Sequence, residues 1–289
     1  MNSTRPDSNV TPVRYGICLA NIGNYSDPRV SVRVAQAAEA AGWDGVFIWD
    51  HLAFVWDAPA ADPWVALSAI AASTSVVRIG TAVTPVARRR PHVLAHELAT
   101  LDRLSNGRVI FGAGLGGSPG EFGRFGEPVE AKVRAEMLDE GLDVMRQLWS
   151  GEEVHHRGAH YTVDGVKFAP TPVQAHIPVW IGGNRPASLR RAGRWDGWLA
   201  DSAAPTGVTL SPDDIARSTE QIGRDDDFTI AMLAQSDLGD PAAYEQAGVH
   251  WWLENVHDKR GTVDEVLALV SAGPGAKGWG QTPSGSDPA

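Results

Sequence analysis

The chain alternates, over most of its length, between short runs rich in β-branched and aromatic residues and longer runs whose apolar residues recur at helical spacing. The short runs predict strands at Arg14–Ala20, Gly45–Trp49, Val77–Val83, Arg108–Ala113, Pro178–Ile181, Gly197–Asp201, Phe228–Leu233 and Val249–Glu254. The longer runs predict helices at residues 28–41, 63–74, 91–104, 128–150, 184–193, 211–222, 240–247 and 262–271. Strict alternation with eight strands favours a parallel sheet closed as a (β/α)8 TIM barrel over an open doubly wound sheet.

Three segments fall outside this alternation. Residues 151–171 predict a β-hairpin inserted between the fourth helix and the fifth strand. Residues 1–12 and 273–289 are expected to be disordered tails, the second because it is rich in Gly, Pro and Ser. The pattern therefore predicts one barrel domain over residues 13–272.

The net charge and the apolar runs of the chain argue against a nucleic-acid partner and against a membrane span. The 25 basic and 35 acidic residues give a net charge of −10, so the basic footprint of a nucleic-acid-binding protein is missing. The longest uncharged apolar-rich run, Pro63–Val77, is shorter than the roughly 20 residues of a membrane helix. The first residues lack the apolar core of a signal peptide, and the lone Cys18 cannot form an intramolecular disulfide. We expect a cytoplasmic protein that binds a small-molecule substrate, with no membrane and no nucleic-acid partner.

In a barrel of this type, the chemistry lies at the C-terminal ends of the strands. Asp50 and His51 directly follow the second predicted strand. An imidazole there can exchange protons near neutral pH, or donate a hydrogen bond to a cofactor carbonyl or peroxide. The alternative is a buried histidine held by its own loop, and position alone does not separate the two. Trp49 and Trp56 flank the pair and could stack on a planar ring.

Gly182 and Gly183 follow the fifth predicted strand and precede a predicted helix. Two glycines let the backbone approach a ligand, and a helix N-terminus offers N–H groups without helical partners. Together these features favour a phosphate site. An ordinary glycine turn is the alternative.

A second glycine-rich stretch, residues 112–117, follows the fourth predicted strand. It matches the G-x-G-x-x-G pattern, but the chain is predicted to stay irregular until about Pro128, which argues against a dinucleotide fold. We predict a long loop that can act as a lid. Arg88, Arg89 and Arg90 follow the third strand and predict either a solvated charge cluster or an anchor for a ligand carboxylate or phosphate.

No metal site and no covalent nucleophile are predicted. His92 and His96 share one helix face, and three further histidines lie on the predicted hairpin, but neither set has the H-E-x-x-H arrangement of a metalloprotease. A G-x-S-x-G motif is absent, and Cys18 lies inside the first strand, where a barrel buries its side chains. A metal-dependent barrel hydrolase is therefore a weakly supported rival.

Together these segments resemble the bacterial luciferase-like monooxygenase family of flavin- and deazaflavin-dependent oxidoreductases. The resemblance rests on four stretches in order: residues 38–51 (AEAAGWDGVFIWDH), 78–85 (RIGTAVTP), 101–114 (LDRLSNGRVIFGAG) and 177–183 (IPVWIGG). It covers roughly Arg14 to Ser202 and continues weakly to the last helix.

The resemblance implies a cofactor, either FMN or the deazaflavin coenzyme F420, whose ring lies across the strand ends. It implies that Asp50 and His51 form the catalytic pair. It assigns five residues to the cofactor site: Ala82, Val83, Gly182, Gly183 and Ser202. The two glycines take the phosphate, and the two residues after Thr81 stand where deazaflavin-using relatives carry a non-prolyl cis peptide under the ring. The arginine run and residues 80–83 favour the deazaflavin slightly.

One departure from the family pattern bears on the substrate. Sugar-phosphate-oxidising deazaflavin relatives carry a carboxylate after the fourth strand, where this chain has Gly117. Glu121 lies four residues on, and the sequence does not decide whether it reaches the site. We therefore expect a reductase or monooxygenase that acts on an apolar or aromatic small molecule.

The resemblance also bears on assembly and on electron supply. We expect the reduced cofactor to come from a separate reductase, and a homodimer is one assembly open to the chain. A non-catalytic flavin-binding barrel is the alternative function.

Overall fold

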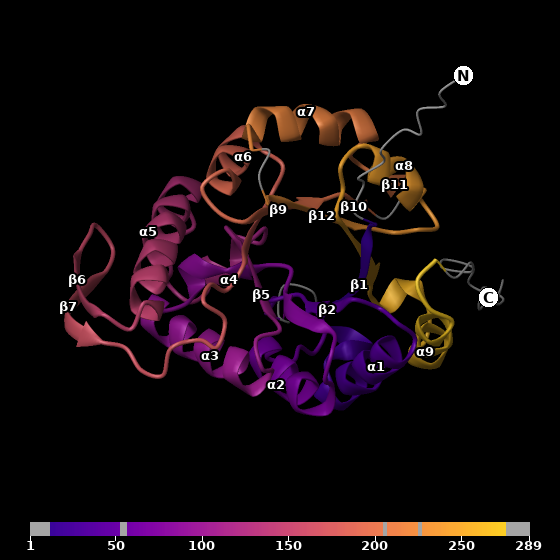
Figure 1. The fold of residues 1–289 in the computed structure, drawn as a ribbon, viewed down its shortest axis with the longest axis horizontal. Helices are drawn as coiled ribbons and strands as arrows, with labels where there is room; N and C mark the ends of the chain where they lie inside the picture. Colours follow the sequence, from indigo (N-terminus) through magenta and orange to yellow (C-terminus); the bar gives the residue numbers. More distant parts are fainter. Residues whose placement is uncertain (1–11, 53–56, 205–206, 225–226, 276–289) are drawn as a thin grey trace, which may run out of the picture.

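The computed structural model describes residues 12–52, 57–204, 207–224 and 227–275. At its centre, parallel strands lie in the order β3-β2-β1-β13-β12-β9-β8-β5, and a pairing between β3 and β5 closes them into a barrel (Figure 1). The strands are β1 (Arg14–Leu19), β2 (Gly45–Ile48), β3 (Arg78–Thr81), β5 (Val109–Gly114), β8 (Val179–Gly182), β9 (Gly197–Asp201), β12 (Thr229–Ala234) and β13 (Trp251–Val256). The predicted TIM barrel is confirmed.

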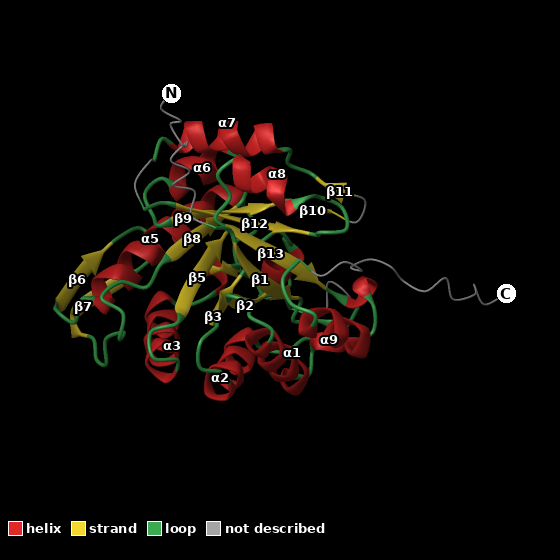
Figure 2. Cartoon of the chain, turned by 45° about the vertical axis from the view of Figure 1, so that its right-hand side comes forward, coloured by secondary structure: helices red, strands yellow, loops and turns green. Residues whose placement is uncertain are grey.

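Helices cover the outside of the barrel (Figure 2). They are α1 (Pro28–Ala40), α2 (Pro63–Ser73), α3 (Pro91–Leu104), α5 (Ala131–Trp149), α6 (Pro186–Ala192), α7 (Pro212–Ile222), α8 (Pro241–Gln246) and α9 (Val263–Ser271). The short helix α4 (Gly120–Gly123) instead lies inside the ring of outer helices (Figure 1). Several begin with proline, whose missing N–H has no helical partner in a first turn. At Asp27, Asp62 and Asp240, the preceding carboxylate accepts hydrogen bonds from that turn, so the sequence fixes these helix starts locally.

Several predicted boundaries differ from the structure, and one segment predicted to be irregular contains a helix. The chain after Gly117 is not irregular up to Pro128, because the short helix α4 forms there. The prediction missed this helix because glycine disfavours helices. Pro119, just before the helix, has the helical φ of −57°. The last strand begins two residues later than predicted, at Trp251. The reason is that the Val249 N–H bonds to the Tyr244 carbonyl and so belongs to the end of α8.

The predicted hairpin is confirmed. Strands β6 (Glu153–Arg157) and β7 (Thr162–Lys167) pair in antiparallel fashion after α5 and extend away from the barrel (Figures 1 and 2). The predicted disordered tails fall almost wholly on residues 1–11 and 276–289, which lie outside the described residues, as does Trp56. None of the helices that the structure describes has the length and hydropathy needed to cross a bilayer.

Three aromatic rings fill the barrel near the starts of its strands. Phe47 stacks on Trp180 at 5.5 Å, and Trp251 meets both rings edge-on, at 5.8 and 5.6 Å. Glycines make room for these rings, since a Cβ on Gly197 would lie 2.5 Å from Trp180 and one on Gly45 would lie 2.9 Å from Phe47. The interior is thus packed at this end, and side chains that could meet a ligand lie at the C-terminal ends of the strands.

Candidate active site at the C-terminal ends of the strands

His51 lies just beyond β2 and is fixed through its backbone. Its N–H donates to the side-chain oxygen of buried Asn21 at 3.2 Å, and its carbonyl accepts from the same amide at 2.8 Å. The imidazole Nδ1 lies 3.0 Å from Oε1 of Glu121, and the side chain is 23% exposed. Because Nδ1 is engaged by Glu121, exchange of a proton with a ligand would involve Nε2.

Glu121 is the residue whose role the sequence left undecided. It lies on α4, is fully buried, and also accepts from the Leu52 N–H at 2.7 Å and from Arg88 at 2.7 Å. The short helix that was not predicted therefore places a carboxylate against the His51 imidazole. At Gly117 itself, a Cβ would meet open space among the described residues.

Asp50 faces two arginines. Arg88, on a 3₁₀ turn after the short strand β4 (Thr84–Pro85), donates to the Asp50 carboxylate and to its carbonyl oxygen, while Arg89 adds contacts of 3.0 and 3.1 Å. Arg88 also binds Glu121, so two carboxylates and two guanidinium groups form one network of formal charge −2 + 2 = 0. The sequence offered a solvated cluster or a ligand anchor for these arginines, and Arg88, with only 7% of its side chain exposed, is not part of a solvated cluster.

Ala82 and Val83 interrupt the third strand of the barrel, between β3 and β4. The strand predicted to continue through Val83 ends at Thr81, and the chain pairs again only at Thr84, opposite Ala113. The peptide between Ala82 and Val83 is cis, as the resemblance implied. The Ala82 N–H donates to the Ile48 carbonyl at 2.9 Å, so this segment lies beside the end of β2 and the residues that lead to His51.

Gly182 and Gly183 must be glycines for two different structural reasons. A Cβ on Gly182 would lie 2.9 Å from a methyl group of Val83, so this glycine makes room for the Val83 side chain. Gly183 has φ +112°, and its N–H and carbonyl are used by Leu199 and Trp198 at 3.3 and 3.0 Å. N–H groups for a phosphate would therefore come from the residues after Gly183.

Six of the seven predicted site residues follow one arc of strand ends, from His51 through Val83 to Gly183. Ser202 is placed differently. Its side chain is fully buried, and its hydroxyl accepts from the Leu210 N–H at 2.8 Å, so it holds the loop that follows β9. The roles of these seven residues in catalysis and cofactor binding stay predictions.

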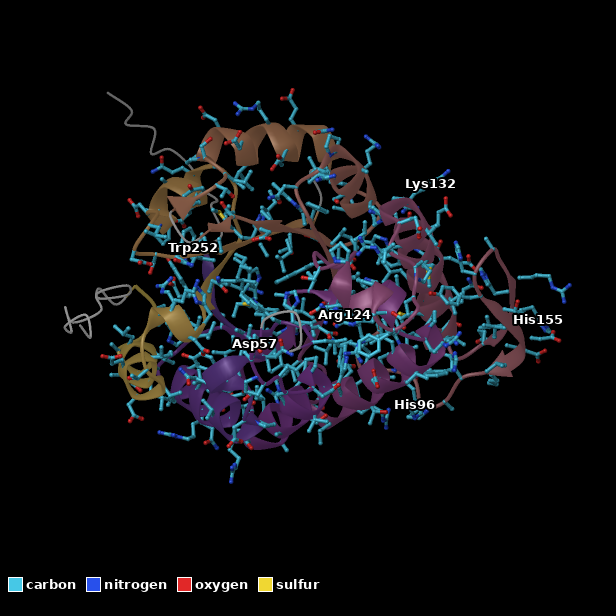
Figure 3. The ribbon with its side chains drawn as sticks, turned by 180° about the vertical axis from the view of Figure 1, so that it is seen from behind. Asp57, His96, Arg124, Lys132, His155 and Trp252 are labelled. Carbon is cyan, nitrogen blue, oxygen red and sulfur yellow. The ribbon has the colours of Figure 1, made fainter. Side chains whose placement is uncertain are left out.

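The described residues contain neither a metal-binding cluster nor a reactive thiol. No group of three His, Cys, Asp or Glu side chains there could hold a metal ion. In Figure 3, His96 and His155 lie at the periphery, well apart from each other. Cys18 is fully buried, and burial raises the pKa of its thiol far above its usual value, so it stays protonated at neutral pH.

Comparisons with known proteins identify the family to which the chain is similar. Residues 13–275 match the model of the family described as luciferase-like monooxygenase. An F420-dependent glucose-6-phosphate dehydrogenase of Nakamurella multipartita is 36% identical over 198 residues, which cover 66% of this chain and 57% of that protein. An F420-dependent hydroxymycolic acid dehydrogenase of Mycobacterium tuberculosis is 33% identical over 230 residues, covering 75% and 61%. This chain thus spans little more than half the length of these curated relatives.

A solved structure shares the fold. An F420-dependent secondary alcohol dehydrogenase in complex with an F420-acetone adduct superposes with a TM-score of 0.71 at 22% identity, covering 85% of this chain and 93% of that one. The family model covers nearly all the described barrel. The chain therefore belongs to the luciferase-like monooxygenase family.

Proposed function

We propose that this chain is an oxidoreductase that transfers a hydride between a small organic molecule and the deazaflavin coenzyme F420. Family membership supports a flavin-type cofactor, and the two curated relatives are named as F420-dependent dehydrogenases. The observation that carries the proposal is the placement of His51. Its imidazole is held on a buried carboxylate at a strand end, beside the Ala82–Val83 segment.

The strand ends fit such a cofactor. Asn255, on β13, follows Trp251 and Leu253 on the inward face of the barrel, and its buried Oδ1 has no hydrogen-bond partner among the described residues. A planar ring with polar edges could satisfy this oxygen. At Gly183, a Cβ would lie 2.9 Å from the Ser188 hydroxyl, so the turn is compact in a way that suits close approach of a phosphate. Ala82 and Val83 would lie against the ring.

The chain's own residues position groups and control protons, while the bound coenzyme supplies hydride transfer. Glu121 holds Nδ1 of His51, so Nε2 is the nitrogen that would give a proton to, or take one from, the substrate oxygen. Arg88 neutralises Glu121 and ties it to Asp50. We therefore assign His51 the acid/base role and Asp50 the role of positioning the arginines.

Several expectations from the sequence stay predictions. The cytoplasmic location, the separate reductase that supplies reduced cofactor and the homodimer have support only from the sequence and the family resemblance. The same is true of oxygen activation as an alternative to hydride transfer. The hydride reading is preferred because both curated relatives are named as dehydrogenases.

An absorbance titration of the full chain with F420 and with FMN tests the proposal. We expect saturable binding of F420, followed by a bleached or restored deazaflavin band when a substrate is added in a single turnover. Binding of FMN alone would assign the protein to FMN chemistry. Binding without turnover over a broad substrate panel would favour the non-catalytic barrel.

A further inference from the structure

Asp201 is the last residue of β9, and it faces the inside of the barrel. Leu199, two residues earlier, packs in the interior cluster with Cys18 and Phe47, and side chains two apart on a strand share a face. The Asp201 carboxylate also helps to raise the pKa of the inward-facing Cys18 thiol, which agrees with this direction. Unlike Leu199, Asp201 is exposed, so its carboxylate lies above the packed interior.

The backbone at Asp201 is fixed, whereas its charge is not neutralised. The Asn184 side chain accepts from the Asp201 N–H at 3.2 Å and donates to its carbonyl at 2.6 Å. No ion pair within the described ranges includes the Asp201 carboxylate, and the Ala203 backbone N–H partly offsets the effect of burial on its pKa. Partial burial raises its pKa. Because no counter-charge neutralises this carboxylate, a ligand that donates a hydrogen bond to it would stabilise its charged form.

The other carboxylates at the strand ends are matched by arginines. Asp50 and Glu121 share Arg88, and Glu254 on β13 binds Arg260 at 2.9 Å. These cations are held by carboxylates of the protein, so none of them is placed to receive a phosphate beside Asp201. The charge that a ligand meets at the end of β9 is therefore negative.

The position of β9 gives this charge a defined relation to His51. Between β9 and β2, the strand order places three strands on one side (β12, β13 and β1) and three on the other (β8, β5 and β3). Asp201 and His51 thus lie at the ends of opposite strands. Half-buried Trp49, Val83 and Ala203 border the interior cluster between them. A molecule that reacts at His51 would meet apolar groups along its body and a carboxylate at its far side.

We propose that Asp201 determines substrate specificity: it selects an apolar molecule whose far end donates a hydrogen bond, as an ammonium or hydroxyl group does, and it disfavours phosphate and carboxylate ends. This inference rests on the proposed function, which makes these strand ends the substrate site. Two features would then distinguish this chain from a sugar-phosphate dehydrogenase. One is the negative charge of Asp201, and the other is the missing carboxylate at Gly117.

Three probes with one body and different ends test the inference: cyclohexylamine, cyclohexanol and cyclohexanecarboxylate. Their affinities are measured by isothermal titration calorimetry on the full wild-type chain at low salt, with and without F420. The variants are Asp201→Asn, Asp201→Ala and the control Asp213→Asn. The control makes the same change in net charge at an exposed position of α7, outside the barrel.

We expect wild type and Asp213→Asn to bind the amine more tightly than the carboxylate. Asp201→Asn should weaken the amine about fivefold, as for a partly exposed ion pair, and should tighten the carboxylate. Loss of cyclohexanol binding in Asp201→Ala, with retention in Asp201→Asn, would identify a hydroxyl as the preferred end. Equal affinities in Asp201→Asn and Asp213→Asn, or no binding of the amine to wild type up to its solubility limit, would overturn the inference.

The F420 titration of the same proteins separates the two claims. A chain that fails to bind F420 but changes its charge preference in Asp201→Asn would contradict the proposed function and keep the role of Asp201. A chain that binds F420 and shows no change in preference would do the reverse.

Discussion

Replacing Glu121 by glutamine is the sharpest test of the active-site network. The substitution keeps the shape of the side chain but removes the charge that accepts from Leu52, Arg88 and His51. The new NH₂ group must face at least one donor, and the network, neutral in the wild type, carries +1. Both effects occur at a fully buried position, where the protein cannot use water to compensate.

The expected loss of stability follows from this burial. Breaking a buried ion pair by removing one partner costs about 3–5 kcal/mol, and the lower end applies because Arg88 keeps Asp50. With an unfolding entropy of about 2.1 cal/mol/K per residue, about 3 kcal/mol lowers the melting temperature by about 5 °C for a chain of 289 residues. The control is Glu127→Gln. Burial raises the pKa of Glu127, and its Oε2 has no hydrogen-bond partner among the described residues, so removing that charge should leave the melting temperature unchanged or slightly higher.

The expected loss of activity has a distinct signature. A carboxylate at Nδ1 favours the tautomer in which Nε2 can accept a proton, whereas an amide NH₂ at Nδ1 favours the opposite tautomer. We expect Glu121→Gln to bind F420 normally, to react about 10²–10⁴-fold more slowly and to show a shifted pH–rate profile. Scanning calorimetry and single-turnover absorbance measure the two effects. A folded variant with the wild-type rate and pH profile would refute the assignment of Glu121 as the residue that orients His51.

Three further outcomes are expected. Gly183→Val should weaken F420 binding strongly in the absorbance titration, because φ +112° and the compact turn suit only glycine, while Gly117→Ala should bind normally; unchanged affinity in folded Gly183→Val would place the phosphate elsewhere. His51→Asn should melt near the wild-type temperature and react about 10²–10⁴-fold more slowly, and full activity would exclude its acid/base role. Burial lowers the pKa of His250, whose Nδ1 accepts from the Ile230 N–H, so the unfolded chain binds more protons and stability falls as the pH drops below about 6.5. His250→Asn, which keeps an acceptor, should flatten the decline in melting temperature between neutral and acidic pH, and an unchanged slope would contradict this.

The barrel could be predicted because each of its elements is encoded locally. Apolar periodicity separates strands from helices, and paired features such as Asp62 before Pro63 mark the helix starts. The eight strand positions were correct to within two residues, and the hairpin was correct. What failed was α4, a helix of four residues between glycines, which is too short for any periodicity to be visible.

The active-site network could be predicted only in part, because its contacts join distant segments. His51 was identified from its position after a strand, but its partner Glu121 lies 70 residues away, on the element that the sequence did not reveal. Arg88 lies 33 residues from Glu121 and 38 from Asp50, and a run of three arginines gives no indication of which ones turn inward. Such pairings depend on the register of neighbouring strands, which local patterns do not contain.

The pair Asp201 and Ser202 shows how a correct strand end can still yield an incomplete site. Both residues follow the same buried strand, and the sequence put Ser202 in the cofactor site. Parallel strands in a barrel are apolar on both faces, so Gly197–Asp201 has no alternation that would show which side chains point inward. The structure supplies the missing reference, because Leu199 packs inside the barrel and therefore sets Asp201 on the inner face, while the Ser202 hydroxyl is buried against Leu210. We therefore propose that a substrate meets the Asp201 carboxylate at the end of β9, and the matched cyclohexyl probes measure the effect of its charge.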